Sequence, residues 1–340
     1  MLAELNYFYG KPTVHGLYKQ QYEDFLVIEE LGFDLTGEGE HILVYLEKKD
    51  CNTIYVAEQL AKYVGISAKN VSYAGLKDRQ AVTQQWFSLH MPGKETPDFS
   101  QFDLTGCRIL QINRHNKKLK IGALKGNRFK IILRNLSDKQ AIEPKLNLIK
   151  QYGVPNYFGE QRFGREQNNI TQAIKWASGE ISVKDRKKRS FYLSAARSAI
   201  FNQIVSQRIE QNIQQTVLDG DILQLSKSNS WFVSSTEELP LLQQRLQNGE
   251  INITAPMVGD SPLGTTSVAL EFETNCLKRW SCFEELFKKE RMATIRRSIL
   301  LRPEQLDWQW ISGNDIEISF YLPSGCYATS VLRELIIGKE

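Results

Sequence analysis

A single carboxylate, Asp78, stands between two cations in the segment 75–86, GLKDRQAVTQQW. The positive charges of Lys77 and Arg79 would keep this carboxylate ionised by Coulomb attraction. An ionised carboxylate can act as a nucleophile or as a base. The spacing alone favours a simpler interpretation, a surface turn whose charges neutralise one another, because Lys-Asp-Arg triplets are common in turns.

The motifs of other catalytic sites are absent from the sequence. The chain has no GxGxxG or GxxxxGK[ST] loop for a nucleotide and no GxSxG turn for a serine nucleophile. The five cysteines form no CxxC pair, and the four histidines show neither HxxxH nor HxE spacing, so no zinc site is predicted. We therefore expect chemistry by a carboxylate, with no metal and no organic cofactor.

Positive charge is concentrated in three parts of the chain, although the net charge is only +4. Residues 104–137 contain nine Lys or Arg and no Asp or Glu, residues 184–189 read KDRKKR, and residues 278–302 contain eight basic and three acidic residues. One such segment would be interpreted as a solvated surface. Three of them in a chain that is otherwise acidic predict a basic surface that meets a polyanion.

The composition is that of a globular protein of about two domains, with 340 residues of which 41% are hydrophobic and 24% charged. The odd number of cysteines fits reduced thiols. The first ten residues lack the basic start of a secretory signal, and no apolar run reaches the roughly 18 residues that span a bilayer. We expect a soluble cytoplasmic protein with no membrane contact. No extended apolar seam is evident, so we also expect a monomer with no obligate protein partner.

Periodic patterns predict a sheet with helices around Asp78, which lies just before a polar and aromatic strand at 85–89. A helix over 53–64 has apolar residues at helical spacing, with Asn52 able to cap its start and Gly65 able to end it. Further strands are predicted at 23–31, 40–47, 107–112 and 129–134, and a further helix within 136–152 that begins after Ser137-Asp138.

The second half of the chain has a different texture. Residues 153–168 are rich in Gly, Asn and aromatic residues and indicate a domain junction. Near the C-terminus Ile316, Ile318 and Phe320 alternate as in a strand. That strand is too small to fold alone, so we expect it to complete the sheet of the first domain and the middle segment to be an insertion. The other elements are a helical region at 168–213, a mixed region at 214–275, and helices at 280–293 and 328–337.

The segment GLKDRQAVTQQ resembles the catalytic motif of the TruD family of tRNA pseudouridine synthases. Other blocks resemble the same family, in the family's order and along nearly the whole chain. These blocks are YKQQYEDFLVIEELGF (18–33), GEGEHILVYLEK (37–48), KGNRFKIILR (125–134), PNYFGEQRFGR (155–165), the helix at 189–209, and LPSGCYATSVLREL (322–335). The match changes the interpretation of Asp78 from a turn residue to a candidate catalytic residue.

The resemblance implies an α+β fold. It predicts a pseudouridine-synthase-like catalytic domain with a mixed, largely antiparallel sheet and flanking helices, and an inserted TruD-specific α/β domain. The catalytic domain is expected at 1–154 and 304–340 and the insertion at 155–303.

The resemblance also implies a reaction, the isomerisation of uridine-13 of tRNA to pseudouridine by an intramolecular transferase that needs no cofactor. The essential Asp of the GLKDR block corresponds to Asp78. This carboxylate could add to C1′ of the ribose, or it could remove the 2′ proton to begin a glycal route, and the sequence leaves both open. The expected partner is tRNA, a structured RNA whose target uridine must leave its stack.

Four residues of the matching blocks are expected around that uridine: Phe25, Asn127, Tyr327 and Lys19, the last as the cation near the carboxylate. Lys77 is the alternative cation, but neighbours in an extended segment point to opposite sides, which favours Lys19. Without the resemblance, Phe25 would be interpreted as a core strand residue, Asn127 as part of a hairpin turn, and Tyr327 as an aromatic residue packed at a helix start.

Three arginines complete the candidates. Arg79, like Lys77, is a candidate supporting cation for Asp78. Arg162 and Arg165 are candidate RNA contacts, although they could equally pack the two domains together.

Two other functions remain open from the sequence. A glycosidic hydrolase with the same pocket would let water intercept C1′ and would release free uracil. A non-enzymatic RNA-binding protein, such as an RNA chaperone, would use Asp78 only as a turn residue.

Overall fold

The computed structural model describes residues 2–226, 228 and 230–339, and the chain divides into two compact units. The sheet unit comprises residues 13–150, 303–328 and 335–339. The helix-rich unit comprises residues 2–12, 151–302 and 329–334.

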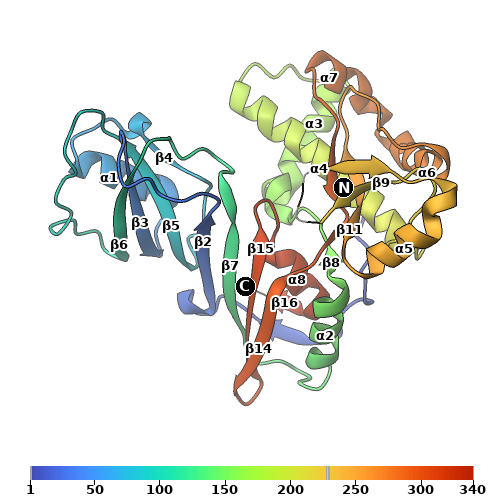
Figure 1. Cartoon of the computed structure of the whole chain (residues 1–340), viewed down its shortest axis with the longest axis horizontal. Helices are drawn as coiled ribbons and strands as arrows, with labels where there is room; N and C mark the ends of the chain where they lie inside the picture. The colour runs from blue at the N-terminus through green and yellow to red at the C-terminus, as the bar shows by residue number, and fades with distance from the viewer. Residues whose placement is uncertain (1, 227, 229, 340) are drawn as a thin grey trace. The chain divides into compact units, whose positions relative to one another are not determined.

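The sheet unit is built on one large, mostly antiparallel sheet (Figure 1). Its strands run in the order β14-β15-β7-β2-β5-β3-β6, with β4 paired to β5, and only the contact between β2 and β5 is parallel. The strands are β2 (Phe25–Leu31), β3 (His41–Lys49), β4 (Val71–Tyr73), β5 (Val82–His90), β6 (Cys107–His115), β7 (Leu124–Leu133), β14 (Glu304–Ser312) and β15 (Asp315–Pro323). The final strand does complete the first sheet, because β15 pairs with β7 along eight residues.

One face of this sheet is covered by α1 (Thr53–Tyr63). Val56 and Leu60, four residues apart on the helix, pack with Leu46 of β3 and Phe87 of β5 in one buried cluster. Asn52 occupies the N-cap position without a side-chain capping bond, and Gly65 follows the helix with a φ of 68°. The sheet unit also contains α2 (Ile142–Tyr152, whose last two residues belong to the helix-rich unit) and a parallel pair of short strands, β1 (His15–Leu17) and β16 (Ile337–Lys339).

The helix-rich unit surrounds a smaller antiparallel sheet of order β10-β9-β11-β12. The strands of the helix-rich unit are β8 (Val154–Pro155), β9 (Ile222–Leu225), β10 (Trp231–Val233), β11 (Ile251–Met257), β12 (Ile295–Ser298) and β13 (Leu300–Leu301), and β8 and β13 pair apart from this sheet. Its helices are α3 (Asn168–Ala177), α4 (Arg186–Glu210), α5 (Leu239–Gln247), α6 (Ser267–Leu277), α7 (Glu284–Lys289) and most of α8 (Ala328–Leu335). The buried ion pair between Arg208 of α4 and Asp221 joins the longest helix to the turn before β9.

The bounds of the units differ from the expected domains at both ends of the chain. Residues 2–12 and 329–334 belong to the helix-rich unit. The reason is the carboxylate of Glu334, whose Oε2 accepts the backbone N–H groups of Phe8 (3.0 Å) and Tyr9 (3.2 Å).

Two predicted helices are shorter than expected. The helix predicted within 136–152 begins only at Ile142, which places Pro144 in its first turn, where proline is tolerated. The helix predicted over 280–293 is a 3-10 segment, Lys278–Phe283, followed by the short α7. The α+β class with a mixed, largely antiparallel sheet is confirmed. Within the described residues, no helix is both long and apolar enough to cross a bilayer.

Candidate active site

The loop that carries Asp78 connects β4 to β5 and is held by hydrogen bonds to α1 and β5. The side chain of Gln85 donates to the carbonyl oxygen of Gly75 (3.3 Å), and the backbone N–H of Lys77 donates to Thr53 Oγ1 (3.1 Å). Thr53 Oγ1 in turn donates to Gln85 Oε1 (2.9 Å). Two buried polar side chains therefore fix the path of this loop.

Lys77 anchors the same loop to β2. Its Nζ lies 2.5 Å from Oε1 of Glu29, whose side chain is completely buried. Burial raises the pKa of Glu29, while the charge of Lys77 and a hydrogen bond from the N–H of Trp86 (2.9 Å) act in the opposite direction. Lys77 is thus engaged with Glu29.

Lys19 is the cation beside Asp78. Its Nζ lies 3.3 Å from Oδ2 of the carboxylate, and its side chain is only 6% exposed, against 37% for Asp78. The carboxylate therefore meets a buried charge on one side and remains accessible on another. The backbone of Lys19 has a φ of 56°, which costs a non-glycine residue about 1–3 kcal/mol.

Phe25 contacts the ammonium of Lys19. The Nζ atom of Lys19 lies 5.0 Å from the centroid of the Phe25 ring, a cation–π distance. The ring is 4% exposed and packs edge-on against Phe129, with 6.2 Å between the centroids. Phe25 is accordingly a core residue of β2 and also a contact of the lysine that binds Asp78.

The strand pairing brings Asn127 to the same face of the sheet. Side chains of one strand share a face at every second residue, so Phe25 and Glu29 lie on one face of β2. Asn127 of β7 pairs directly with Glu29, and directly paired residues in neighbouring strands share a face. Because Lys77 binds Glu29, the loop of Asp78 reaches this face too.

Asn127 lies inside β7, so its interpretation as part of a hairpin turn is wrong. Gly126 precedes it because a Cβ at that position would collide with the carbonyl oxygen of Leu322 and the ring of Tyr321 in β15. Oδ1 of Asn127 is buried and accepts no hydrogen bond from the described residues. A buried amide oxygen in this state can accept a donor from a ligand.

Tyr327 lies in the turn between β15 and α8. The N–H of Ser324 in this turn donates to the carbonyl oxygen of Lys125 (3.0 Å), two residues before Asn127. The turn therefore starts beside the end of β7 that carries Asn127. Tyr327 is half-buried, immediately before α8 begins.

Arg79 is engaged elsewhere. Its Nε lies 2.7 Å from Oδ1 of Asp50, and this pairing raises the pKa of Arg79 and lowers that of Asp50. The charge of Arg79 is therefore compensated by Asp50.

Arg162 and Arg165 belong to the helix-rich unit. Arg162 donates to Ser194 Oγ (3.1 Å) and stacks its guanidinium 5.4 Å from the ring centroid of Phe158. Arg165 is 94% exposed and lies 3.8 Å from Glu166. Arg162 is thus packed within its unit, and Arg165 faces solvent.

Several residues of the three basic segments have structural partners. Arg134 binds the buried carboxylate of Asp24 (2.6 Å) and also Asp315 (3.1 Å), and Arg296 binds Glu273 (2.7 Å). Other basic residues of the first segment are exposed, among them Lys117, Lys118, Lys120 and Lys125.

Glu29 and Lys48 are two residues near Asp78 that the sequence did not single out. Lys48 is fully buried, and its Nζ donates to the carbonyl oxygen of Asp78 (3.0 Å). Strand alternation contained a signal for both residues. Glu29 follows Phe25 at the inward spacing of β2, and Lys48 stands two residues after buried Leu46 in β3, so each is a charged residue at a core position.

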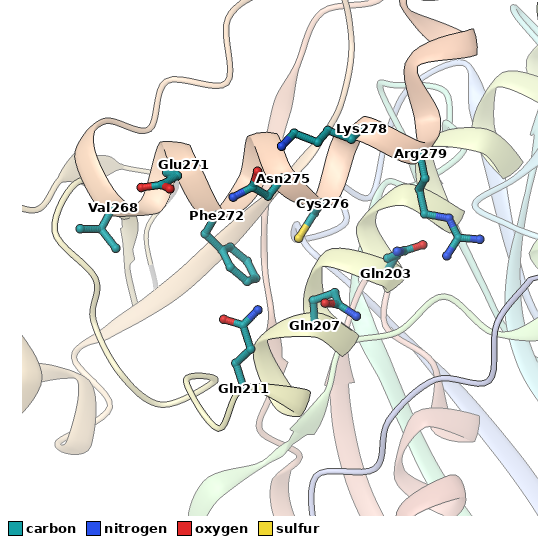
Figure 2. Close-up of a pocket in the computed structure, with 10 residues that line it drawn as sticks. All are labelled: Gln203, Gln207, Gln211, Val268, Glu271, Phe272, Asn275, Cys276, Lys278 and Arg279. Carbon is teal, nitrogen blue, oxygen red and sulfur yellow. The ribbon is translucent and has the colours of Figure 1, made fainter.

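A groove of about 430 Å³ lies in the helix-rich unit between α4 and α6. Figure 2 shows Gln203 and Gln207 of α4, together with Gln211 just after this helix, opposite Phe272 and Asn275 of α6. The groove contains none of the residues predicted to form the site, which lie on the sheet unit or elsewhere on the helix-rich unit.

Comparisons with known proteins define the class. The fold is similar to that of a solved structure from Methanosarcina mazei described as tRNA pseudouridine synthase D (TruD), with a TM-score of 0.75 over 97% of this chain and 95% of that chain, at 23% sequence identity. The family described as "tRNA pseudouridine synthase D (TruD)" matches residues 2–177 and 178–335. The chain is also 54% identical to tRNA pseudouridine synthase D of Proteus mirabilis (strain HI4320) over 336 residues, which cover 99% of this chain and 96% of the relative. The chain therefore belongs to the TruD family of tRNA pseudouridine synthases, as the sequence motifs indicated.

Proposed function

We propose that this protein isomerises uridine-13 of tRNA to pseudouridine, with Asp78 as the catalytic carboxylate and without a cofactor. Membership of the family supports the class of enzyme, an isomerase that acts on tRNA. The observation that carries the role of Asp78 is its geometry: an accessible carboxylate paired with a buried lysine.

The reaction moves one bond of the nucleotide and consumes nothing. The bond from N1 of uracil to C1′ breaks, the base turns, and C5 bonds to C1′; C5 loses its proton and N1 gains one. Asp78 either adds to C1′ and later leaves, or removes the 2′ proton to form a glycal. In both routes Lys19 places a positive charge 3.3 Å from the carboxylate of Asp78.

The flipped uracil is bound by Asn127 and Tyr327, and Phe25 supports the site from beneath. The unpartnered Oδ1 of Asn127 can accept a hydrogen bond from the N3–H of uracil. Enzymes that flip a base recognise it through hydrogen bonds to this edge. The ring of Tyr327 provides the stacking face, and Phe25 contributes by holding Lys19 in place.

Phosphate contacts position the RNA on the enzyme. The exposed lysines Lys117, Lys118, Lys120 and Lys125 of the sheet unit, and the exposed Arg165 of the helix-rich unit, are the proposed contacts. Arg162 is a weaker candidate because its guanidinium already donates to Ser194 and stacks on the ring of Phe158. Contacts of this type make affinity fall with rising salt and carry no sequence information.

The test is the substitution Asp78→Asn, which keeps the shape of the side chain and removes its charge. Purified variants are incubated with unmodified tRNA without added cofactor, and pseudouridine is mapped by carbodiimide labelling and reverse transcription. We expect Asp78→Asn to lose about 10²–10⁴-fold or more in rate, the typical contribution of a catalytic base, while tRNA binding in a filter assay is retained. The matched control is Asp34→Asn, which removes an exposed carboxylate from the turn between β2 and β3 and should leave the rate unchanged.

The same assay separates the other two functions. Free uracil with an abasic site would indicate the glycosidic hydrolase. Binding of tRNA with no pseudouridine from the wild-type protein would indicate the non-enzymatic RNA-binding protein. Full activity of Asp78→Asn would remove Asp78 from the mechanism.

A further inference from the structure

Lys48 is the penultimate residue of β3, and its side chain is fully buried. Its Nζ donates to the carbonyl oxygens of Cys51 (2.8 Å) and Asp78 (3.0 Å). Both acceptors are uncharged, and within the described part of the chain no carboxylate lies at ion-pair distance from this ammonium. A buried ammonium is costly without partners, so these two backbone carbonyls are what compensates its burial.

Asp78 is consequently held at two atoms by two different lysines. Lys48 binds its main-chain carbonyl oxygen from within the sheet, and Lys19 binds its carboxylate (3.3 Å). Fixing both ends of one residue also fixes where its reactive oxygen lies. A displacement of about 1 Å in a reacting group can cost about 10²-fold in rate.

We propose that Lys48 is a positioning residue for Asp78, whose buried ammonium holds the carbonyl oxygen of Asp78 and thereby sets the place of the carboxylate. The inference rests on the proposed catalytic role of Asp78. Lys48 acts through Asp78 and contacts no reacting atom itself.

The groups around Lys48 give this arrangement a pH dependence. They are the thiols of Cys51 and of Cys107, which lies opposite Lys48 in β6, together with Asp78 and Lys77. Burial lowers the pKa of Lys48 to about 8; the charge of Lys77 adds to this shift and that of Asp78 opposes it. Burial raises the pKa of Cys107 to about 12, so that thiol stays neutral near pH 8. As pH rises through about 8, Lys48 loses its charge, and its hydrogen bond to Asp78 weakens.

The first experiment compares Lys48→Met with Lys49→Met. Methionine keeps the length of the buried chain and removes its charge and its donors, which leaves the carbonyl oxygens of Cys51 and Asp78 without this partner. Lys49 is the exposed neighbour, paired with Glu23, and serves as the matched control. In single-turnover assays on tRNA we expect Lys48→Met to be slowed about 10²-fold with tRNA affinity within about twofold of wild type, and Lys49→Met to be unchanged. A folded Lys48→Met with the wild-type rate overturns the proposal.

The second experiment does not depend on the fold of a Met variant. The single-turnover rate of the wild-type protein is measured from about pH 6.5 to 9.5, with tRNA affinity measured at each pH. We expect the rate to fall with an apparent pKa near 8 while affinity changes little, and Lys48→Arg, whose charge persists at these pH values, to move that fall out of the range. A wild-type rate that stays level to the top of this range, or an unchanged fall in a folded Lys48→Arg, overturns the proposal.

Asp78→Asn is assayed beside these variants, so the two proposals can fail separately. An active Asp78→Asn contradicts the proposed catalytic role itself. An inactive Asp78→Asn with a fully active Lys48→Met contradicts only the positioning role of Lys48.

Discussion

Glu29 of β2 and Lys77 of the loop before β5 form an ion pair of 2.5 Å in which the carboxylate is completely buried and the lysine side chain is 11% exposed. The two residues are far apart in sequence, so this pair ties the loop of Asp78 to the sheet. Loss of one partner would leave the other charge buried and unpaired.

We therefore expect Glu29→Gln to destabilise the protein by about 3–5 kcal/mol, the usual cost of breaking a buried pair from one side. The double variant Glu29→Gln/Lys77→Met should recover a large part of that loss, because neither charge remains. Urea unfolding followed by circular dichroism gives both values. A double variant as unstable as the single one would show that the pair does not couple the loop to β2.

Lys19→Met removes the cation next to Asp78. Because the carboxylate would then lose its counter-charge, we expect a rate about 10²-fold lower in single-turnover assays, with tRNA affinity nearly unchanged. Lys19→Arg keeps the positive charge but replaces the compact ammonium by a planar guanidinium. Its rate should therefore lie between those of Lys19→Met and the wild type. Equal rates for all three proteins would mean that the ion pair is dispensable for the reaction.

Tyr327→Ala removes a ring proposed to stack on uracil, whereas Tyr327→Phe removes only the hydroxyl. Stacking of a base on an aromatic side chain contributes about 1–3 kcal/mol, so Tyr327→Ala should be slower by about fivefold to 150-fold. Tyr327→Phe should remain close to the wild type. Equal losses in the two variants would assign the effect to the hydroxyl.

His41 makes the stability of the sheet unit sensitive to acid. It is buried in β3 and stacks on His90, with 4.8 Å between the ring centroids. Burial is the main cause that lowers the pKa of His41 below 6.5, and the neighbouring His90 lowers it further. The folded state therefore binds fewer protons than the unfolded state just below pH 6.5. The contribution of neutral His41 to the free energy of unfolding is complete above pH 6.5 and is lost as pH falls through the lowered pKa of His41.

Urea unfolding at neutral pH and at progressively lower pH measures this effect. His41→Gln should flatten the pH dependence, and the control His15→Gln, at an exposed histidine, should retain it. The same slope in His41→Gln and in the wild type would exclude His41 as its source.

Much of the fold follows from local periodicity. Alternation in β2 and helical spacing in α1 predicted both elements because each buries one face against the core. The start of α2 did not follow from periodicity, because Asp138 accepts the N–H groups of Gln140 (2.9 Å) and Ala141 (3.3 Å) and forms a turn where a helix was expected. β14 was missed although Leu306, Trp308 and Trp310 alternate with polar residues along it; most of its residues are exposed.

The site was predictable only where its residues stand in recognisable blocks. Asp78 and Lys19 were proposed as site residues in this way, and the structure brings their charged groups together. The engagement of Lys77 with Glu29 and of Lys48 with the carbonyl oxygen of Asp78 depends on how separate strands meet in space. Local sequence carries no information about such long-range pairing beyond the presence of a charged residue at an inward position.

The pairing of β15 with β7 has a consequence for biosynthesis. β7 emerges from the ribosome well before residues 315–323, because the whole middle of the chain is translated between them. Until then one edge of β7 has no partner and could join another nascent chain. Glu334, which binds the backbone of Phe8 and Tyr9, is translated later still, so neither unit can close until the chain has been translated beyond residue 334.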